Sequence, residues 1–210
     1  MSDLTGSSGC ALAPFSIFNA SFTPAPGSPA TAADDIGVSI GYDGNSIGIS
    51  FNGLFLFPAD TSDPPGYAEY FIRYTIDPPP PVILGFDMDM DFGGDQFRFA
   101  GPSLFSILAG PPIVEVFTEL CVGGDFARLV GCTGVPYGPI ILDPTNTLDG
   151  VRFAGSTNWV SVIHRIRVTQ DIDLNLNNRA PLDSTVPEPG TWAMMGSGIL
   201  LLAMGWRRRR

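Results

Sequence analysis

Residues 36–57 read IGVSIGYDGNSIGISFNGLFLF. On both sides of the polar segment at 43–46, apolar side chains alternate with small or polar ones. A period of two residues is typical of a β-strand with one buried face, and the Asp-Gly-Asn-Ser segment has the composition of a tight turn. The stretch therefore predicts a β-hairpin, and the residues expected on its apolar face are Ile36, Val38, Ile40, Tyr42, Ile47, Ile49, Phe51, Phe55 and Phe57.

The same alternation recurs along most of the chain. It predicts a first strand at 15–22, a pair of strands at 70–76 and 82–92 on either side of four prolines, and another strand at 114–122. It also predicts one long last strand at 159–176. No internal segment has a convincing helical period. Roughly seven to ten antiparallel strands with one solvated face indicate an all-β fold, an antiparallel β-sandwich of lectin-like or jelly-roll-like type.

Shifts in composition divide the chain into five expected parts. The sandwich is expected at its centre, preceded by a segment rich in Ser, Ala and Pro that includes the first strand. A polar stalk is expected to follow the sandwich, and an apolar helix and a basic end to follow the stalk. The expected bounds are 1–35 for the first segment, 36–176 for the sandwich, 177–189 for the stalk, 190–206 for the helix and 207–210 for the basic end.

Charge and cysteine content exclude some classes of function. The 210 residues carry 21 acidic side chains against 11 basic ones, for a net charge of −10, which excludes a nucleic-acid binder that works through a basic surface. Cys121 and Cys132 bracket a Gly-rich turn, so we expect a disulfide between them in an oxidising compartment, with two free thiols as the alternative. Cys10 is left without a partner. The single histidine makes a zinc site a poor fit.

The C-terminal end has three ordered features. Pro187, Glu188 and Pro189 precede 17 residues without charge, and Arg207, Arg208, Arg209 and Arg210 close the chain. As a helix, residues 190–206 would be about 25 Å long, at the short limit for crossing a bilayer. The terminal arginines would hold that end in the cytoplasm and leave residues 1–186 on the outer side. An amphipathic helix and a buried core helix are the alternatives.

This end resembles the PEP-CTERM protein-sorting signal of Gram-negative bacteria, a segment that some catalogues label an ice-binding-protein C-terminal domain. The resemblance implies export, arrest in the inner membrane, cleavage near Pro187-Glu188-Pro189 by an exosortase, and a final place at the cell surface or in an exopolysaccharide matrix. Loss of residues 187–210, with four Arg and one Glu, would change the net charge from −10 to −13. Residues 1–10 lack the pattern of a signal peptide, which leaves an upstream start or an unusual export route open.

An acidic run at 87–95 is the sharpest local feature. Asp87, Asp89 and Asp91 would share one face of a strand, so a cation or an arginine such as Arg98 would relieve their repulsion. Together with Asp95 they could supply several oxygen ligands to calcium. The spacing is not that of an EF-hand. The alternative is a strand whose Asp residues face solvent while Met and Phe face the core.

The remaining candidates for chemistry are weak. Residues 44–48 match the short pattern of a nucleophile elbow, but a hairpin turn is the wrong context for one. His164 falls on an apolar strand face and is expected to be buried. Trp159 falls on a polar face and could stack on a sugar ring. We therefore expect a non-catalytic structural or adhesive protein without an obligatory cofactor. The alternatives are a carbohydrate-binding module, with or without calcium, and a surface hydrolase.

Overall fold

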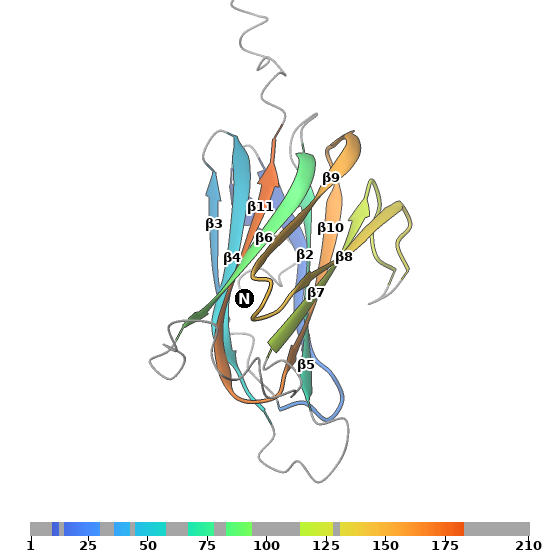
Figure 1. Cartoon of the computed structure of the whole chain (residues 1–210). Helices are drawn as coiled ribbons and strands as arrows, with labels where there is room; N and C mark the ends of the chain where they lie inside the picture. The colour runs from blue at the N-terminus through green and yellow to red at the C-terminus, as the bar shows by residue number, and fades with distance from the viewer. Residues whose placement is uncertain are drawn as a thin grey trace, which may run out of the picture.

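The computed structural model describes residues 10–12, 15–29, 36–42, 45–57, 67–77, 83–93, 114–127 and 131–182. Within these ranges the regular structure consists of eleven strands in two sheets (Figure 1). The six-stranded sheet contains, in spatial order, β1 (Cys10–Leu12), β2 (Phe15–Pro24), β5 (Ala68–Asp77), β10 (Val160–Val168), β7 (Val114–Val122) and β8 (Val135–Leu142). The five-stranded sheet contains β3 (Gly37–Tyr42), β4 (Ser46–Phe55), β11 (Ile172–Pro181), β6 (Ile83–Gly93) and β9 (Leu148–Thr157).

Both sheets are antiparallel, and they bury one face each against the other. Phe51 of the five-stranded sheet lies 5.3 Å from Tyr74 and 5.9 Å from His164 of the six-stranded sheet, measured between ring centroids. Phe55 meets Tyr70 in the same way at 5.4 Å. These contacts make one hydrophobic core shared by two layers, as in a β-sandwich, and the all-β prediction is confirmed.

The predicted hairpin at 36–57 is present as β3 and β4. The two strands pair from Tyr42 opposite Ile47 to Gly37 opposite Asn52. Ile47, Ile49, Phe51 and Phe55 are each no more than 2% exposed, as the alternation predicts. Tyr42 differs, because it stands at the end of an edge strand and is 46% exposed.

The predicted single strand at 159–176 is wrong. Residues 160–168 form β10 in the centre of one sheet, and residues 172–181 form β11 in the centre of the other. The chain changes sheets at 169–171, where Asp171 accepts a hydrogen bond from the backbone N–H of Phe57 at 2.6 Å. Because this corner contains an odd number of residues, even-numbered side chains face the core in both strands. The alternation of apolar and polar residues therefore continues through the corner, and the sequence pattern gives no sign that the chain changes sheets there.

The two strands around the four prolines do not pair with each other. β5 lies between β2 and β10, whereas β6 lies between β11 and β9 in the opposite sheet. The register of β6 against β9 also shifts between Ile83 and Gly85, so Ile83 rather than Leu84 is fully buried. A single irregularity in the ladder reverses the faces on which side chains emerge.

Three strands, β1, β8 and β9, escape the sequence analysis. β8 contains two prolines and a glycine, and the Gly138-Pro139 peptide bond is cis. β9 is mostly exposed, with Leu148 69% accessible. Prolines and exposed small residues hide the period of two on which the prediction depends.

The expected domain limits also need correction. β2 is an integral strand of the six-stranded sheet, so residues 15–24 belong to the sandwich. β11 continues to Pro181, and Leu182 bridges to Ile83, so residues 177–182 belong to the sheet and not to a stalk. The segments expected as helix and basic end, 190–206 and 207–210, lie outside the described residues. In the described ranges, none of the chain forms a helix long and apolar enough to cross a membrane.

Candidate functional site

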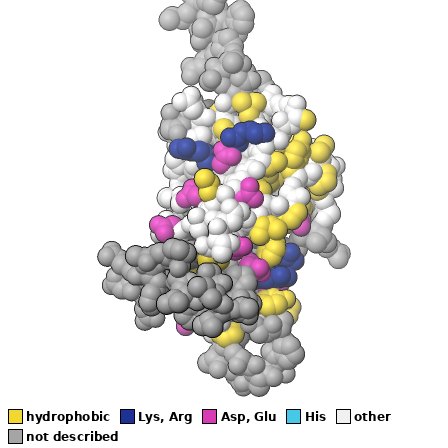
Figure 2. Space-filling view, viewed as in Figure 1, with side chains coloured by type: hydrophobic (Ala, Val, Ile, Leu, Met, Phe, Trp, Pro, Cys, Tyr) yellow, Lys and Arg dark blue, Asp and Glu magenta, His cyan; other side chains and the backbone are white. Residues whose placement is uncertain are grey.

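Small and polar side chains occupy the outer face of the five-stranded sheet. Strand pairing aligns them in rows that cross β3, β4, β11, β6 and β9. On the face seen in Figure 2, acidic and basic side chains are interspersed. The first row runs Gly41, Gly48, Arg179, Asp87 and Gly150, and the second runs Ser39, Ser50, Asn177, Asp89 and Leu148.

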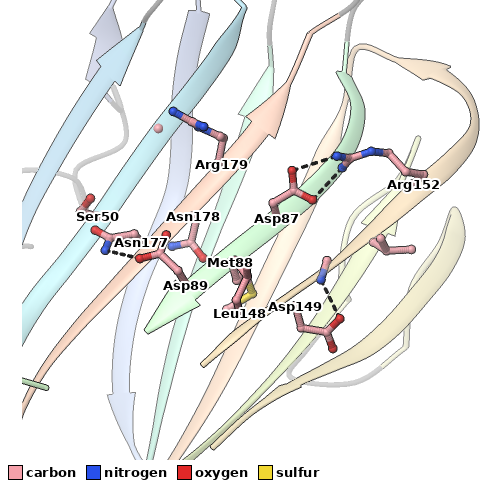
Figure 3. Close-up of a pocket in the computed structure, with 13 residues that line it drawn as sticks. Ser50, Asp87, Met88, Asp89, Leu148, Asp149, Arg152, Asn177, Asn178 and Arg179 are labelled. Carbon is pink, nitrogen blue, oxygen red and sulfur yellow. Dashed lines mark hydrogen bonds and ion pairs between the residues drawn. The ribbon is translucent and has the colours of Figure 1, made fainter. Parts of the chain in front are cut away.

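A groove of about 790 Å³ follows these rows over β4, β11, β6 and β9 (Figure 3). Two glycines in the first row keep it open. A Cβ on Gly150 would collide with the carboxylate of Asp87, so this carboxylate needs a glycine beside it. A Cβ on Gly48 would approach nothing closer than the carbonyl oxygen of Gly41, at 3.9 Å, so the space above Gly48 belongs to the groove.

Arg152 and Asp87 form a bidentate ion pair in this groove. Nη1 and Nη2 of Arg152 donate to the two carboxylate oxygens of Asp87 at 2.7 and 3.1 Å, and hydrogen bonding to this carboxylate raises the pKa of Arg152. The sequence analysis expected a cation or an arginine such as Arg98 to relieve the repulsion among the acids. The arginine observed comes from β9, whereas Arg98 lies outside the described residues.

The other acids of the run follow the predicted alternation. Asp89 and Asp91 are exposed, while Met88 and Met90 are buried in the core. Oδ2 of Asp89 accepts a hydrogen bond from the Asn177 amide at 2.8 Å. Among the residues that the structure describes, no three acid, histidine or cysteine side chains are grouped as a metal site would require, and Asp95 is outside that part of the chain. The calcium site therefore stays a prediction.

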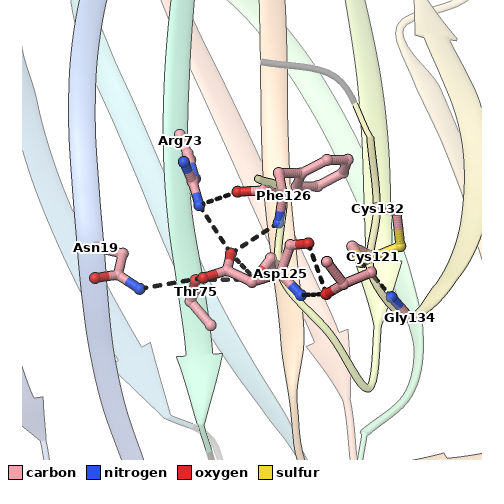
Figure 4. Close-up of polar contacts among 10 residues, drawn as sticks. Asn19, Arg73, Thr75, Cys121, Asp125, Phe126, Cys132 and Gly134 are labelled. Carbon is pink, nitrogen blue, oxygen red and sulfur yellow. Dashed lines mark hydrogen bonds and ion pairs between the residues drawn. A yellow bond between two sulfur atoms is a disulfide. The ribbon is translucent and has the colours of Figure 1, made fainter. Parts of the chain in front are cut away.

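A second polar cluster lies beside the disulfide, on the outer face of the six-stranded sheet (Figure 4). Sγ of Cys121 and Sγ of Cys132, the two expected partners, are 2.05 Å apart. Within the loop that they close, Oδ1 of Asp125 accepts hydrogen bonds from Arg73 at 2.9 Å and from Ser161 at 2.8 Å.

Asp125 is held in its ionised form. Burial alone would raise the pKa of Asp125, but hydrogen bonds from Ser161 and Arg73, the charge of Arg73 and the backbone N–H of Phe126 together lower it. These bonds tie the loop to β5 and β10. Phe126 of the loop packs with Ile163 of β10, and the two side chains are 3% and 4% exposed. The loop thus covers the outer face of β10 at Ser161 and Ile163.

His164 is fully buried between the sheets, as its place on the apolar face predicts. Nδ1 lies 2.7 Å from the Thr118 hydroxyl, and Nε2 lies 3.1 Å from the Tyr74 hydroxyl. Burial lowers the pKa of His164 to about 3 and raises that of Tyr74 well above its ordinary value. The imidazole is therefore neutral and has no contact with solvent, which suits a core residue rather than a catalytic base.

Trp159 precedes β10 and is partly buried. Its ring packs edge-on against Phe18, with centroids 5.0 Å apart, and its Nε1 is buried without a hydrogen-bond partner. Trp159 does not line the groove of the other sheet. Its sugar-stacking role stays a prediction, on a ring that Phe18 partly covers.

The last strand of the sandwich ends four residues before a segment that matches a family model. β11 stops at Pro181, and residues 185–210 match the family model of the PEP-CTERM protein-sorting motif. The chain carries a PEP-CTERM sorting motif. None of the curated proteins and none of the solved structures matches the chain.

The PEP-CTERM match confirms the resemblance drawn from the sequence. It includes Pro187, Glu188 and Pro189 and the four terminal arginines, all of which lie outside the described residues. The motif implies export, membrane-associated sorting and processing by an exosortase. The groove and the PEP-CTERM motif are linked through one strand, because β11 carries Asn177 and Arg179 and then leads to residue 185.

The sequence analysis missed Arg152, Asn177 and Arg179 as members of one site. Asn177 and Arg179 fall in the segment 177–189 that was expected to be a stalk, although they continue the alternation of the strand that leads into it. The pairing of β11 with β6, and of β6 with β9, brings the three residues together, and that pairing joins segments that are far apart in the chain.

Proposed function

We propose that this protein is exported, processed at its PEP-CTERM motif by an exosortase-type peptidase, and retained at the cell surface or in an exopolysaccharide matrix. There the sandwich serves a structural or adhesive purpose without catalysis. The observation that carries the proposal is the family-model match at residues 185–210, directly after a folded domain. A sorting motif of this kind directs the sorting of the domain that precedes it in the chain.

The position of β11 supports processing inside the motif. β11 pairs with β4 on one side and β6 on the other, so it is the central strand of its sheet. Removal of β11 would expose the core and leave β4 and β6 each without one of its two partner strands. Cleavage at Pro187-Glu188-Pro189 leaves β11 and Leu182 in place, and the released domain keeps all eleven described strands.

The chemistry of the described residues favours binding over catalysis. Asp87 has both carboxylate oxygens engaged by Arg152, and His164 is enclosed in the core. General acid–base catalysis needs a proton-transferring group within reach of a substrate. The ion pair instead holds Asp87 in a fixed position as a hydrogen-bond acceptor.

The test is fractionation of host cells that express the full chain. Wild type is expected in the surface or matrix fraction, whereas a variant with Pro187, Glu188 and Pro189 all changed to Ala is expected in the inner membrane. Thr191→Ala, inside the matched segment but outside the Pro-Glu-Pro motif, is the control and should behave as wild type. Wild-type protein that stays in the inner membrane, or a triple variant that still reaches the surface, would overturn the proposal.

The adhesive role has its own readout. Cells that lack the protein are expected to attach less well to a surface coated with their own exopolysaccharide, and the wild-type chain should restore attachment. Unchanged attachment would restrict the protein to a structural role. Release of reducing sugar or of ester products by the purified chain would favour the surface hydrolase instead.

A further inference from the structure

We infer that the groove over β4, β11, β6 and β9 binds an uncharged, polyhydroxylated ligand, namely a stretch of neutral sugar residues. The inference rests on the proposed adhesive function and names its site and ligand class. It concerns a different place from Trp159, which lies outside this groove.

The charge balance of the groove argues against a charged ligand. Three aspartates, Asp87, Asp89 and Asp149, stand against Arg152 and Arg179. The charge of Asp87 is compensated within the site by Arg152. An anionic ligand would meet the carboxylates of Asp89 and Asp149, and a bare cation would meet the guanidinium group of Arg179. A neutral ligand avoids both penalties.

The hydrogen-bonding groups of the groove match hydroxyl groups. The Asp89–Asn177 bond at 2.8 Å uses one of two amide N–H groups and one of two carboxylate oxygens. The pair can therefore still accept hydrogen bonds and donate one. A hydroxyl group both donates and accepts, so neighbouring hydroxyls of a sugar can bond to such a pair from both sides.

The groove side chains are held in place before a ligand arrives. Asp87 is fixed by two bonds from Arg152, and Asp89 is fixed by Asn177. Both pairs stand on paired strands rather than on loops. Ordering these groups in advance lowers the entropy lost on binding, which matters for a ligand that makes mainly polar contacts.

The shape suits a chain laid across the sheet. The groove is open to solvent, and its volume of about 790 Å³ lies within the range of roughly 300–1,000 Å³ typical of small-ligand sites. Gly48 gives it a floor without a side chain, and Leu148, 69% exposed, offers an apolar surface to the C–H face of a sugar ring. An extended peptide fits less well, because the backbone groups of β4, β11 and β6 are used in strand pairing.

Gly48 makes a selective test available. Gly48→Val should fill the floor of the groove without a collision, because a Cβ there has only ordinary contacts. The matched control is Gly41→Val, in the same row on the edge strand β3, where a Cβ meets nothing within 4 Å and the residue does not line the groove. Valine suits a β-strand, so both variants should fold.

The experiment uses the full chain, purified in a detergent without a sugar headgroup. Binding is measured by biolayer interferometry to immobilised dextran, xyloglucan and galactomannan as neutral polysaccharides and to alginate as an acidic one. We expect at least one neutral polysaccharide to bind, and alginate to bind at least tenfold more weakly. Gly48→Val should weaken neutral binding tenfold or more, and Gly41→Val should stay within twofold of wild type.

Asp89→Ala provides a second variant in case Gly48→Val does not fold. Asp89 is exposed, so its truncation should leave the fold intact and still weaken neutral binding at least threefold. The inference is overturned if no neutral polysaccharide binds, if alginate is preferred, or if a folded Gly48→Val binds as wild type does.

Fractionation of the same variants separates this inference from the proposed function. Gly48→Val should reach the surface fraction as wild type does. Normal delivery of a wild-type protein that binds no neutral polysaccharide would overturn the sugar site alone. Failed delivery with intact sugar binding would overturn the proposed sorting alone.

Discussion

Arg152 on β9 donates to both carboxylate oxygens of Asp87 on β6, at 2.7 and 3.1 Å, although 65 residues separate the two in the chain. The pair neutralises one carboxylate of the acidic run at 87–95 and fixes the position of that carboxylate at the groove. Since the Arg152 side chain is 62% exposed, water screens the interaction. The pair therefore contributes to the shape and charge of the groove more than to the stability of the domain.

Arg152→Ala is accordingly expected to change the free energy of unfolding by less than about 1 kcal/mol. Urea denaturation of the variant beside wild type measures this directly. A loss of more than about 2 kcal/mol, beyond what an exposed ion pair contributes, would show that Arg152 has a packing role that its exposure does not indicate.

The disulfide should matter more for stability. Replacing Cys121 and Cys132 by Ala opens a loop whose ends are 11 residues apart. Loss of this cross-link is expected to lower the free energy of unfolding by about 2–3 kcal/mol, chiefly by freeing the unfolded chain. Val135→Ala, at a 55% exposed position near the loop, is the control and should be close to neutral. A double variant as stable as wild type would contradict this account.

Asp125 links the same loop to β5 and β10. Asp125→Asn removes the negative charge that Arg73 and Ser161 bind, and a loss of about 1–3 kcal/mol is expected in denaturation at pH 7. The folded-state pKa of Asp125 lies below its ordinary 3.8, so its stabilising effect is present above pH 3.8 and is lost as the pH falls further. Wild type should therefore lose more stability than Asp125→Asn below pH 3.8, and parallel pH profiles would rule this out.

His164 predicts a second pH dependence at milder acidity. The unfolded chain takes up a proton near pH 6.5, whereas the folded chain resists protonation until about pH 3. Stability contributed by the neutral imidazole is thus complete above pH 6.5 and falls as the pH drops from 6.5 toward 3. The slope for one proton is about 1.4 kcal/mol per pH unit.

Urea denaturation at pH 7 and pH 5 measures this slope. His164→Gln does not titrate, so the difference between the two pH values should shrink in that variant even if its stability at pH 7 is lower. Equal pH dependence in wild type and His164→Gln would show that another group is responsible.

Alternation of side chains predicted the strands that alternate cleanly, together with the buried state of His164 and the outward direction of Asp87 and Asp89. It could not assign strands to sheets. Val168 and Ile172 have the same parity on either side of a corner, so a change of sheet leaves no trace in the pattern. β8 and β9 were missed because prolines, glycines and exposure remove the period of two.

The groove could not be predicted from the sequence either, because the sequence does not show the order of the strands in the sheet. Asp87, Arg152 and Asn177 come from three strands, and only the order β11, β6, β9 makes them neighbours. The PEP-CTERM motif, in contrast, is contiguous in the chain, and its residues could be identified without any structure.

Sorting through the PEP-CTERM motif is the central claim, and the intact mass of the native protein outside host cells tests it most directly. The account predicts a species that keeps Leu182, and with it all of β11, but lacks residues 190–210, and that disappears in a host without the exosortase. A full-length chain of 22.3 kDa that remains in the inner membrane of both hosts would contradict it.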